Sequence, residues 1–206
     1  MKMNRLFIFI FVILGAFMSY NSSANIDAHK FKFKSIDGNE IKLIDFKGKP
    51  IFIINTASLC GFTNQYKDIE ELYNQYKKDE LIVLGIPSND FGNQELSSNQ
   101  EVKEFCSTNF GVTFLLTEIT KIKGDEGHPF FIWIKNEAGF LAFPKWNFYK
   151  YLIDKNGKLV SWYASTTKPN SKKITKINVR NKKAILRWLF INYSIKLHLL
   201  SITQKH

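Results

Sequence analysis

The sequence predicts an α/β fold in which a mixed central β-sheet carries helices on both faces. Residues 50–56 and 81–86 are apolar runs without polar alternation, which is typical of strands covered on both sides. Between these runs, apolar residues from Tyr66 to Tyr76 recur at helical spacing. A strand, a helix and a second strand in this order form a βαβ unit, whose right-handed crossover makes the two strands parallel.

Shorter elements are expected on either side of this unit. Apolar and polar residues alternate around Asp37-Gly38, a dipeptide that strongly favours a β-hairpin. Asn156-Gly157 predicts a second hairpin near the end of the domain. The remaining pattern predicts two helices, at 98–107 and 129–136, and a short strand at 112–116. The arms of the second hairpin are expected at 149–153 and 159–163.

The first 24 residues have the pattern of an export signal. Lys2 and Arg5 form a basic start, and residues 6–18 are an uninterrupted apolar run. Small residues at 22–24 offer a cleavage site. The alternative is a membrane anchor, but the run has 13 residues, whereas a spanning helix needs roughly 20. We therefore expect residues 1–24 to be a signal peptide and the protein to be exported, either periplasmic or extracellular.

Length and charge divide the rest of the chain. The 206 residues leave room for one domain, expected at 25–178, and a basic apolar tail at 179–206. The net charge of +11 belongs to the C-terminal third, because residues 138–206 carry fourteen Lys and Arg and one acidic residue, Asp154. Export argues against nucleic acid as a partner. For the tail, an ordinary packed terminus, a disordered one and weak contact with a membrane surface all remain open.

Cys60 and Cys106 are the two cysteines of the chain. Because an exported protein can keep a disulfide, an inert structural bridge is one interpretation. However, Cys60 follows the strand at 50–56 and precedes the next helix, which Thr63 is expected to cap. Reactive groups of α/β sheets collect there, and the unpaired N–H groups of a helix N-terminus favour a thiolate. The four histidines show no metal-ligand spacing, so we expect neither a metal nor another cofactor.

Three separated motifs resemble those of the glutathione peroxidases. The segment NTASLCGFTNQY at 55–66 resembles the active-site signature of that family, and IPSNDFGNQE at 86–95 and KWNF at 145–148 agree in order and spacing. The resemblance covers about residues 30–170. It implies a thioredoxin-like fold and a thiol peroxidase that reduces hydrogen peroxide and organic or lipid hydroperoxides.

The resemblance also implies a catalytic tetrad. By motif, it carries over onto Cys60, Gln94, Trp146 and Asn147. The residue types suit the reaction, because a thiolate attacks one peroxide oxygen while neutral amide and indole donors stabilise the departing oxyanion without neutralising the sulfur.

Cys106 matches the resolving cysteine of the thioredoxin-dependent members of the family. The implied cycle runs from a Cys60 sulfenic acid to a Cys60–Cys106 disulfide, which a thioredoxin-like protein or glutathione reduces. This chain departs from many relatives at Ser88 and Asp90, neither of which is a tetrad position. Its short loop before Trp146 favours a monomer.

Other functions remain open at this point. The chain could be a non-catalytic exported domain with an inert Cys60–Cys106 bridge, or a peroxide sensor that passes its disulfide to another protein. A disulfide reductase or isomerase would need a C-x-x-C pair, and position 63 is a threonine.

Overall fold

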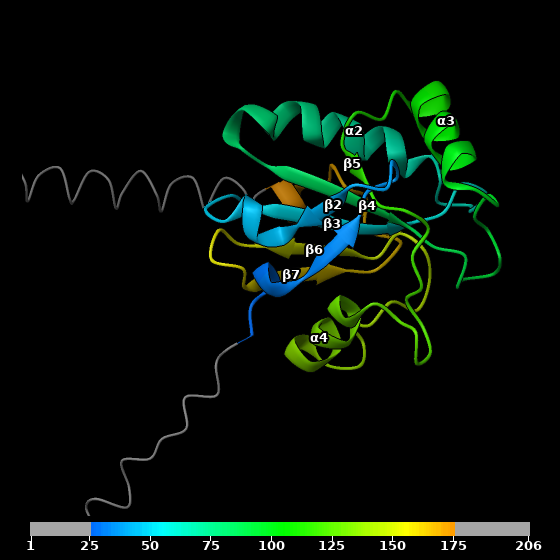
Figure 1. Ribbon diagram of the computed structural model, residues 1–206. Coiled ribbons are helices and arrows are strands. Elements are labelled where there is room, and N and C mark those ends of the chain that lie inside the picture. The colour runs from blue at the N-terminus through cyan, green and yellow to red at the C-terminus, as the bar shows by residue number, and fades with distance from the viewer. Residues whose placement is uncertain (1–25, 176–206) are drawn as a thin grey trace, which may run out of the picture.

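The computed structural model describes residues 26–175 (Figure 1). The expected signal peptide at 1–24 and tail at 179–206 lie outside the described residues. Within 26–175, no helix combines the length and apolar character that crossing a membrane requires.

The sheet has five strands in the order β5-β4-β3-β6-β7. Their bounds are β3 Ile51–Thr56, β4 Ile82–Pro87, β5 Leu115–Leu116, β6 Lys150–Ile153 and β7 Leu159–Tyr163. Strand β3 pairs in parallel with β4 and antiparallel with β6. The predicted βαβ unit, the mixed sheet and the second hairpin are therefore confirmed. The first hairpin, β1 Lys32–Lys34 and β2 Glu40–Lys42, is also present as a separate two-stranded sheet.

Helices cover both faces of the sheet. Figure 1 shows α2 (Gln65–Tyr76) and α3 (Asn99–Phe110) on one face and α4 (Pro129–Ala138) on the other. Short 3-10 turns η1, η2 and η3 occupy Ala28–Lys30, Leu43–Phe46 and Lys77–Asp79. All six residues of β3 are buried. Ile51 and Ile53 belong to the apolar cluster beneath α4, while Phe52 and Ile54 belong to the cluster beneath α2 and α3. Burial on both faces explains why this strand lacks polar alternation.

Most predicted boundaries differ from the structure by one or two residues, and two differ by three. The short strand is limited to Leu115–Leu116, because the Thr113 backbone N–H instead donates to the Glu70 carboxylate on α2 at 2.9 Å. Helix α3 continues past residue 107 to Phe110 and ends at Gly111, whose left-handed φ of 62° is easily adopted by glycine. The first difference comes from a contact with a distant segment, whereas the second follows from the glycine directly after the helix.

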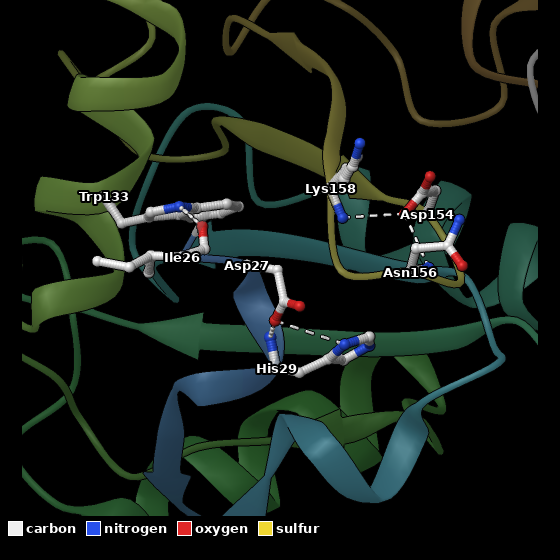
Figure 2. Close-up of polar contacts among 7 residues, drawn as sticks. All are labelled: Ile26, Asp27, His29, Trp133, Asp154, Asn156 and Lys158. Carbon is white, nitrogen blue, oxygen red and sulfur yellow. Dashed lines mark hydrogen bonds and ion pairs between the residues drawn. The ribbon is translucent and has the colours of Figure 1, made fainter. Parts of the chain in front are cut away.

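The N-terminal segment is anchored to the domain by polar contacts (Figure 2). Trp133 Nε1 on α4 donates to the Ile26 carbonyl at 2.8 Å. The Asp27 carboxylate caps η1 by accepting from His29 N at 2.8 Å, and Ala28 N donates to Gly157 O at 2.8 Å. The turn between β6 and β7 is thereby joined to the start of the described chain.

Gly157 is packed so closely that a side chain cannot fit. Its φ is 81°, and a Cβ would lie 2.7 Å from His29 Nδ1 and 2.9 Å from Asp27 Cγ. We expect Gly157→Ala to lower the free energy of unfolding by about 2–4 kcal/mol, through left-handed backbone strain and overpacking. Gly38→Ala is the control, because Gly38 has a φ of 86° and no atom within 4 Å of a Cβ. Urea unfolding should show a loss of only about 1–2 kcal/mol for that control, and equal losses would refute the close contact.

Candidate active site

Cys60 lies in the turn between β3 and α2. Cys60 is 7% exposed. The Phe62 backbone N–H points at the Cys60 sulfur, with 3.5 Å between N and Sγ. The Cys60 N–H donates to Thr63 Oγ1 at 3.0 Å. The turn therefore directs one backbone N–H at the sulfur and fixes the Cys60 backbone through Thr63.

Thr63 does not cap α2, contrary to the sequence prediction. The helix begins at Gln65, and its N-cap, Asn64, makes no side-chain capping hydrogen bond. The Thr63 hydroxyl instead faces three carbonyls of the turn, at 2.6 Å from Cys60 O, 3.0 Å from Ala57 O and 3.2 Å from Ser58 O. The Thr63 hydroxyl therefore closes the Cys60 turn. The N–H group that faces the sulfur belongs to Phe62 in this turn and not to helix α2.

The segment that follows β4 holds the Cys60 turn in place. Leu59 N donates to Gln94 O at 2.8 Å, and Ser58 N donates to Glu95 Oε1 at 3.0 Å. Glu95 is buried, and its burial raises the pKa of the carboxyl. Glu95 is not among the site residues predicted from the sequence. The available signal was its position beside Gln94 at the end of the 86–95 block.

Gln94 and Asn147 are joined directly. Asn147 is fully buried, and its Nδ2 donates to Gln94 Oε1 at 3.1 Å and to Phe91 O at 3.2 Å. The Gln94 carboxamide oxygen is therefore already occupied. Its Nε2 group is the end that remains to donate to a ligand or to the sulfur.

Trp146 lies beside the same group. Its ring rests on Gly92, where a Cβ would lie 3.1 Å from the Trp146 ring and 3.5 Å from Gln94 Cδ. The residue is 39% exposed. The Asn55 side chain in β3 donates to Trp146 O at 3.1 Å, which fixes the backbone from which the indole projects.

The structure thus brings together three of the predicted side chains: Gln94, Trp146 and Asn147. Cys60 is connected to them through the backbone bond between Leu59 and Gln94. Among the hydrogen bonds of residues 26–175, none joins the Cys60 sulfur to a tetrad side chain.

Cys106 is placed differently. It lies on α3 with no exposed surface, and both cysteines are free thiols in this structure. Burial raises the pKa of the Cys106 thiol to about 11. Cys106 is therefore a poor nucleophile where it lies, although it shares an apolar cluster with Cys60.

A metal site is not evident in the part of the chain that the structure describes. Within that part, no three His, Cys, Asp or Glu residues are grouped so that they could hold an ion.

The fold defines a class of protein. A crystal structure of a thioredoxin-family thiol:disulfide interchange protein from Chlorobium tepidum matches 73% of this chain and 94% of its own, with a TM-score of 0.54 at 17% identity. This likeness shows the fold alone, which is thioredoxin-like. The family follows from the sequence comparisons.

The chain belongs to the glutathione peroxidase family. The family model described as glutathione peroxidase matches residues 28–135. A glutathione peroxidase of Lactococcus lactis is 42% identical over 143 residues, which are 68% of this chain and 91% of the relative. A hydroperoxy fatty acid reductase of Synechocystis is 41% identical over 157 residues, which are 72% and 93% of the two chains. The predicted fold and family are confirmed, and the protein is a glutathione-peroxidase-like peroxidase.

Proposed function

We propose that the Cys60 thiol of this peroxidase reduces hydrogen peroxide and organic hydroperoxides, including lipid hydroperoxides. The observation that carries the proposal is the Cys60 turn. Its sulfur faces a backbone N–H, and its backbone is bonded to the segment that carries Gln94. The Synechocystis relative is named a hydroperoxy fatty acid reductase, and this name favours lipid hydroperoxides among the substrates.

In the first step, the Cys60 thiolate attacks one peroxide oxygen and the O–O bond breaks. The sulfur becomes a sulfenic acid, and the other oxygen leaves as hydroxide or alkoxide and takes a proton to give water or an alcohol. Gln94 Nε2 and the indole N–H of Trp146 donate to this departing oxygen. Asn147 acts through Gln94, because its Nδ2 already donates to Gln94 Oε1 and to the backbone.

In the second step, Cys106 attacks the Cys60 sulfenic acid. A disulfide forms, and the oxygen leaves as water with the proton of the Cys106 thiol. Since Cys106 is fully buried and its thiol has a pKa of about 11, helix α3 must open locally before the two sulfurs meet. A thioredoxin-like protein or glutathione then reduces the disulfide.

The setting of this cycle is also proposed from the sequence. The signal pattern at 1–24 supports export to the periplasm or the cell exterior. The short loop before Trp146 supports a monomer, and the basic, aromatic tail at 179–206 supports weak contact with an anionic membrane surface.

Steady-state peroxide reduction with alternative reductants tests the proposal. The mature protein is supplied with a thioredoxin system, with glutathione, or with neither, and the loss of peroxide is followed. We expect the thioredoxin system to sustain turnover by the unaltered protein, while Cys106→Ser completes about one turnover and then stops, because no disulfide can form. Undiminished thioredoxin-driven turnover by Cys106→Ser would disprove the resolving role.

A further inference from the structure

The backbone beside the predicted tetrad adopts an unusual conformation. Among residues 26–175, three residues other than glycine have a positive φ: Glu80, Asn93 and Phe148. Asn93 directly precedes Gln94, and Phe148 directly follows Asn147. The left-handed region is unfavourable for a bulky side chain, so Phe148, with a φ of 62°, needs support from the structure around it. Strained residues of this kind cluster at functional sites.

Strand β3 supports the turn at 146–148 from one side. The side chain of Asn55, which is fully buried, donates from Nδ2 to Trp146 O at 3.1 Å. The Phe148 N–H donates to Asn55 O at 2.7 Å, and the Tyr149 N–H donates to Asn55 Oδ1 at 2.8 Å. These three bonds hold the backbone on both sides of Asn147.

Ser165 holds the carbonyl of Asn147 itself. It lies two residues beyond the end of β7, and its hydroxyl donates to Asn147 O at 2.5 Å. Both residues are buried. Because this bond fixes the peptide group between Asn147 and Phe148, it opposes any rotation that would relax the strained φ and turn the Asn147 side chain away from Gln94.

Two long polar side chains hold Ser165 in turn. Gln65 Nε2, at the start of α2, donates to Ser165 O at 2.7 Å, and Lys150 Nζ, on β6, donates to the same oxygen at 3.1 Å. Lys150 has no exposed surface, and burial lowers the pKa of its ammonium group to about 7. Taking a charge out of water costs free energy, which an apolar side chain at this position would avoid. The stability of the fold therefore does not account for a lysine here.

We propose that Ser165 is a positioning residue for peroxide reduction and that Lys150 holds Ser165 in this role. The Ser165 hydroxyl fixes the turn that carries Trp146 and Asn147, and Asn147 Nδ2 holds the side chain of Gln94. The inference rests on the proposed function, in which Gln94 and Trp146 donate to the departing oxygen. Ser165 and Lys150 act through these donors and not on the peroxide.

Two variants test the two contacts separately. Ser165→Ala removes the hydroxyl. Lys150→Met keeps an unbranched side chain but removes the ammonium group, and Ser165 O stays bonded to Gln65 Nε2. The matched controls are Thr166→Ala and Lys158→Met, which remove the same groups from exposed residues.

Stopped-flow mixing with hydrogen peroxide below pH 7, where Lys150 is mostly charged, measures oxidation of Cys60 in the reduced proteins. Urea unfolding measures the free energy of unfolding. Ser165→Ala should slow oxidation about tenfold, as the misplacement of donors requires. Lys150→Met should slow it about threefold or more without lowering the free energy of unfolding, a combination that a loss of packing does not produce. Both controls should match the unaltered protein.

A second measurement separates positioning from a general loss of structure. Ser165→Ala is also made in the Asn147→Ala background. There it should slow oxidation by a smaller factor than in the unaltered protein, because residues that act through one another are not additive. Hydrogen exchange of the Asn147 side-chain amide, followed by nuclear magnetic resonance and assigned by its loss in Asn147→Ala, should be faster in Ser165→Ala.

The possible failures are distinguishable. If the unaltered protein oxidises Cys60 and Ser165→Ala does so equally fast, the inference is overturned while the proposed function stands. An equal factor in the Asn147→Ala background also overturns it, and an unchanged rate in Lys150→Met refutes the role of Lys150. If the unaltered protein does not oxidise Cys60, the proposed function fails and the inference fails with it.

Discussion

Replacing Cys60 with serine is expected to abolish peroxide consumption. The sulfur at this position faces the Phe62 backbone N–H and can accept an oxygen atom from a peroxide, whereas a serine hydroxyl does not ionise near neutral pH and cannot accept an oxygen atom. The rate of peroxide consumption by Cys60→Ser should fall to the rate of a solution without protein. The measurement is the disappearance of hydrogen peroxide with the reduced protein and a thioredoxin system.

Cys106→Ser is the matched control for this variant, because it also removes one thiol. It should consume about one equivalent of peroxide, while Cys60→Ser consumes none. Circular dichroism should show that both variants are folded. If Cys60→Ser kept the activity of the unaltered protein, another group would have to be the nucleophile.

The second largest effect is expected at Gln94. Removal of one preorganised donor to a developing oxyanion costs on the order of 10²–10³ in rate, so Gln94→Ala should slow Cys60 oxidation by about that factor. Trp146→Phe should also slow Cys60 oxidation, because phenylalanine is still aromatic but has no N–H donor. Stopped-flow mixing of the reduced protein with peroxide measures this step alone. Asn136→Ala, an exposed change on α4, is the control and should react like the unaltered protein.

Asn147 gives this prediction a sharper form. Its amide donates to Gln94, so Asn147→Ala should slow oxidation by releasing the Gln94 side chain. The double variant Gln94→Ala/Asn147→Ala should then be no slower than Gln94→Ala, because residues that act through one another are not additive. If the two substitutions slow oxidation independently, so that their effects multiply, Asn147 contributes directly to the reaction. If all of these variants react as fast as the unaltered protein, the three side chains serve only packing.

The central fold was predictable because burial determines the pattern of apolar and polar residues along the sequence. Strand β3 lacks polar alternation since both of its faces are covered, and the hairpin turn at Gly38 needs the positive φ that glycine provides. Helix spacing likewise located α2. These features depend on neighbours along the chain or on burial alone, which the residue pattern records.

Most of the parts that escaped prediction depend on contacts between distant segments. The short length of β5 follows from the bond between Thr113 and Glu70, which are 43 residues apart. Thr63 reads as a helix cap, but its hydroxyl closes the Cys60 turn. The tetrad residues were located by motif, yet the bond from Asn147 to Gln94, 53 residues away, and the support from Glu95 became visible only in three dimensions.

The most direct test of Cys60 as the nucleophile is the mass of the Cys60 peptide after one turnover. Reduced Cys106→Ser is mixed with one equivalent of hydrogen peroxide, treated with a sulfenic-acid trap such as dimedone, and digested for mass spectrometry. If Cys60 is the nucleophile, the trap is attached to Cys60 in nearly every molecule and to no other residue. An unmodified Cys60 after complete consumption of the peroxide would contradict this role.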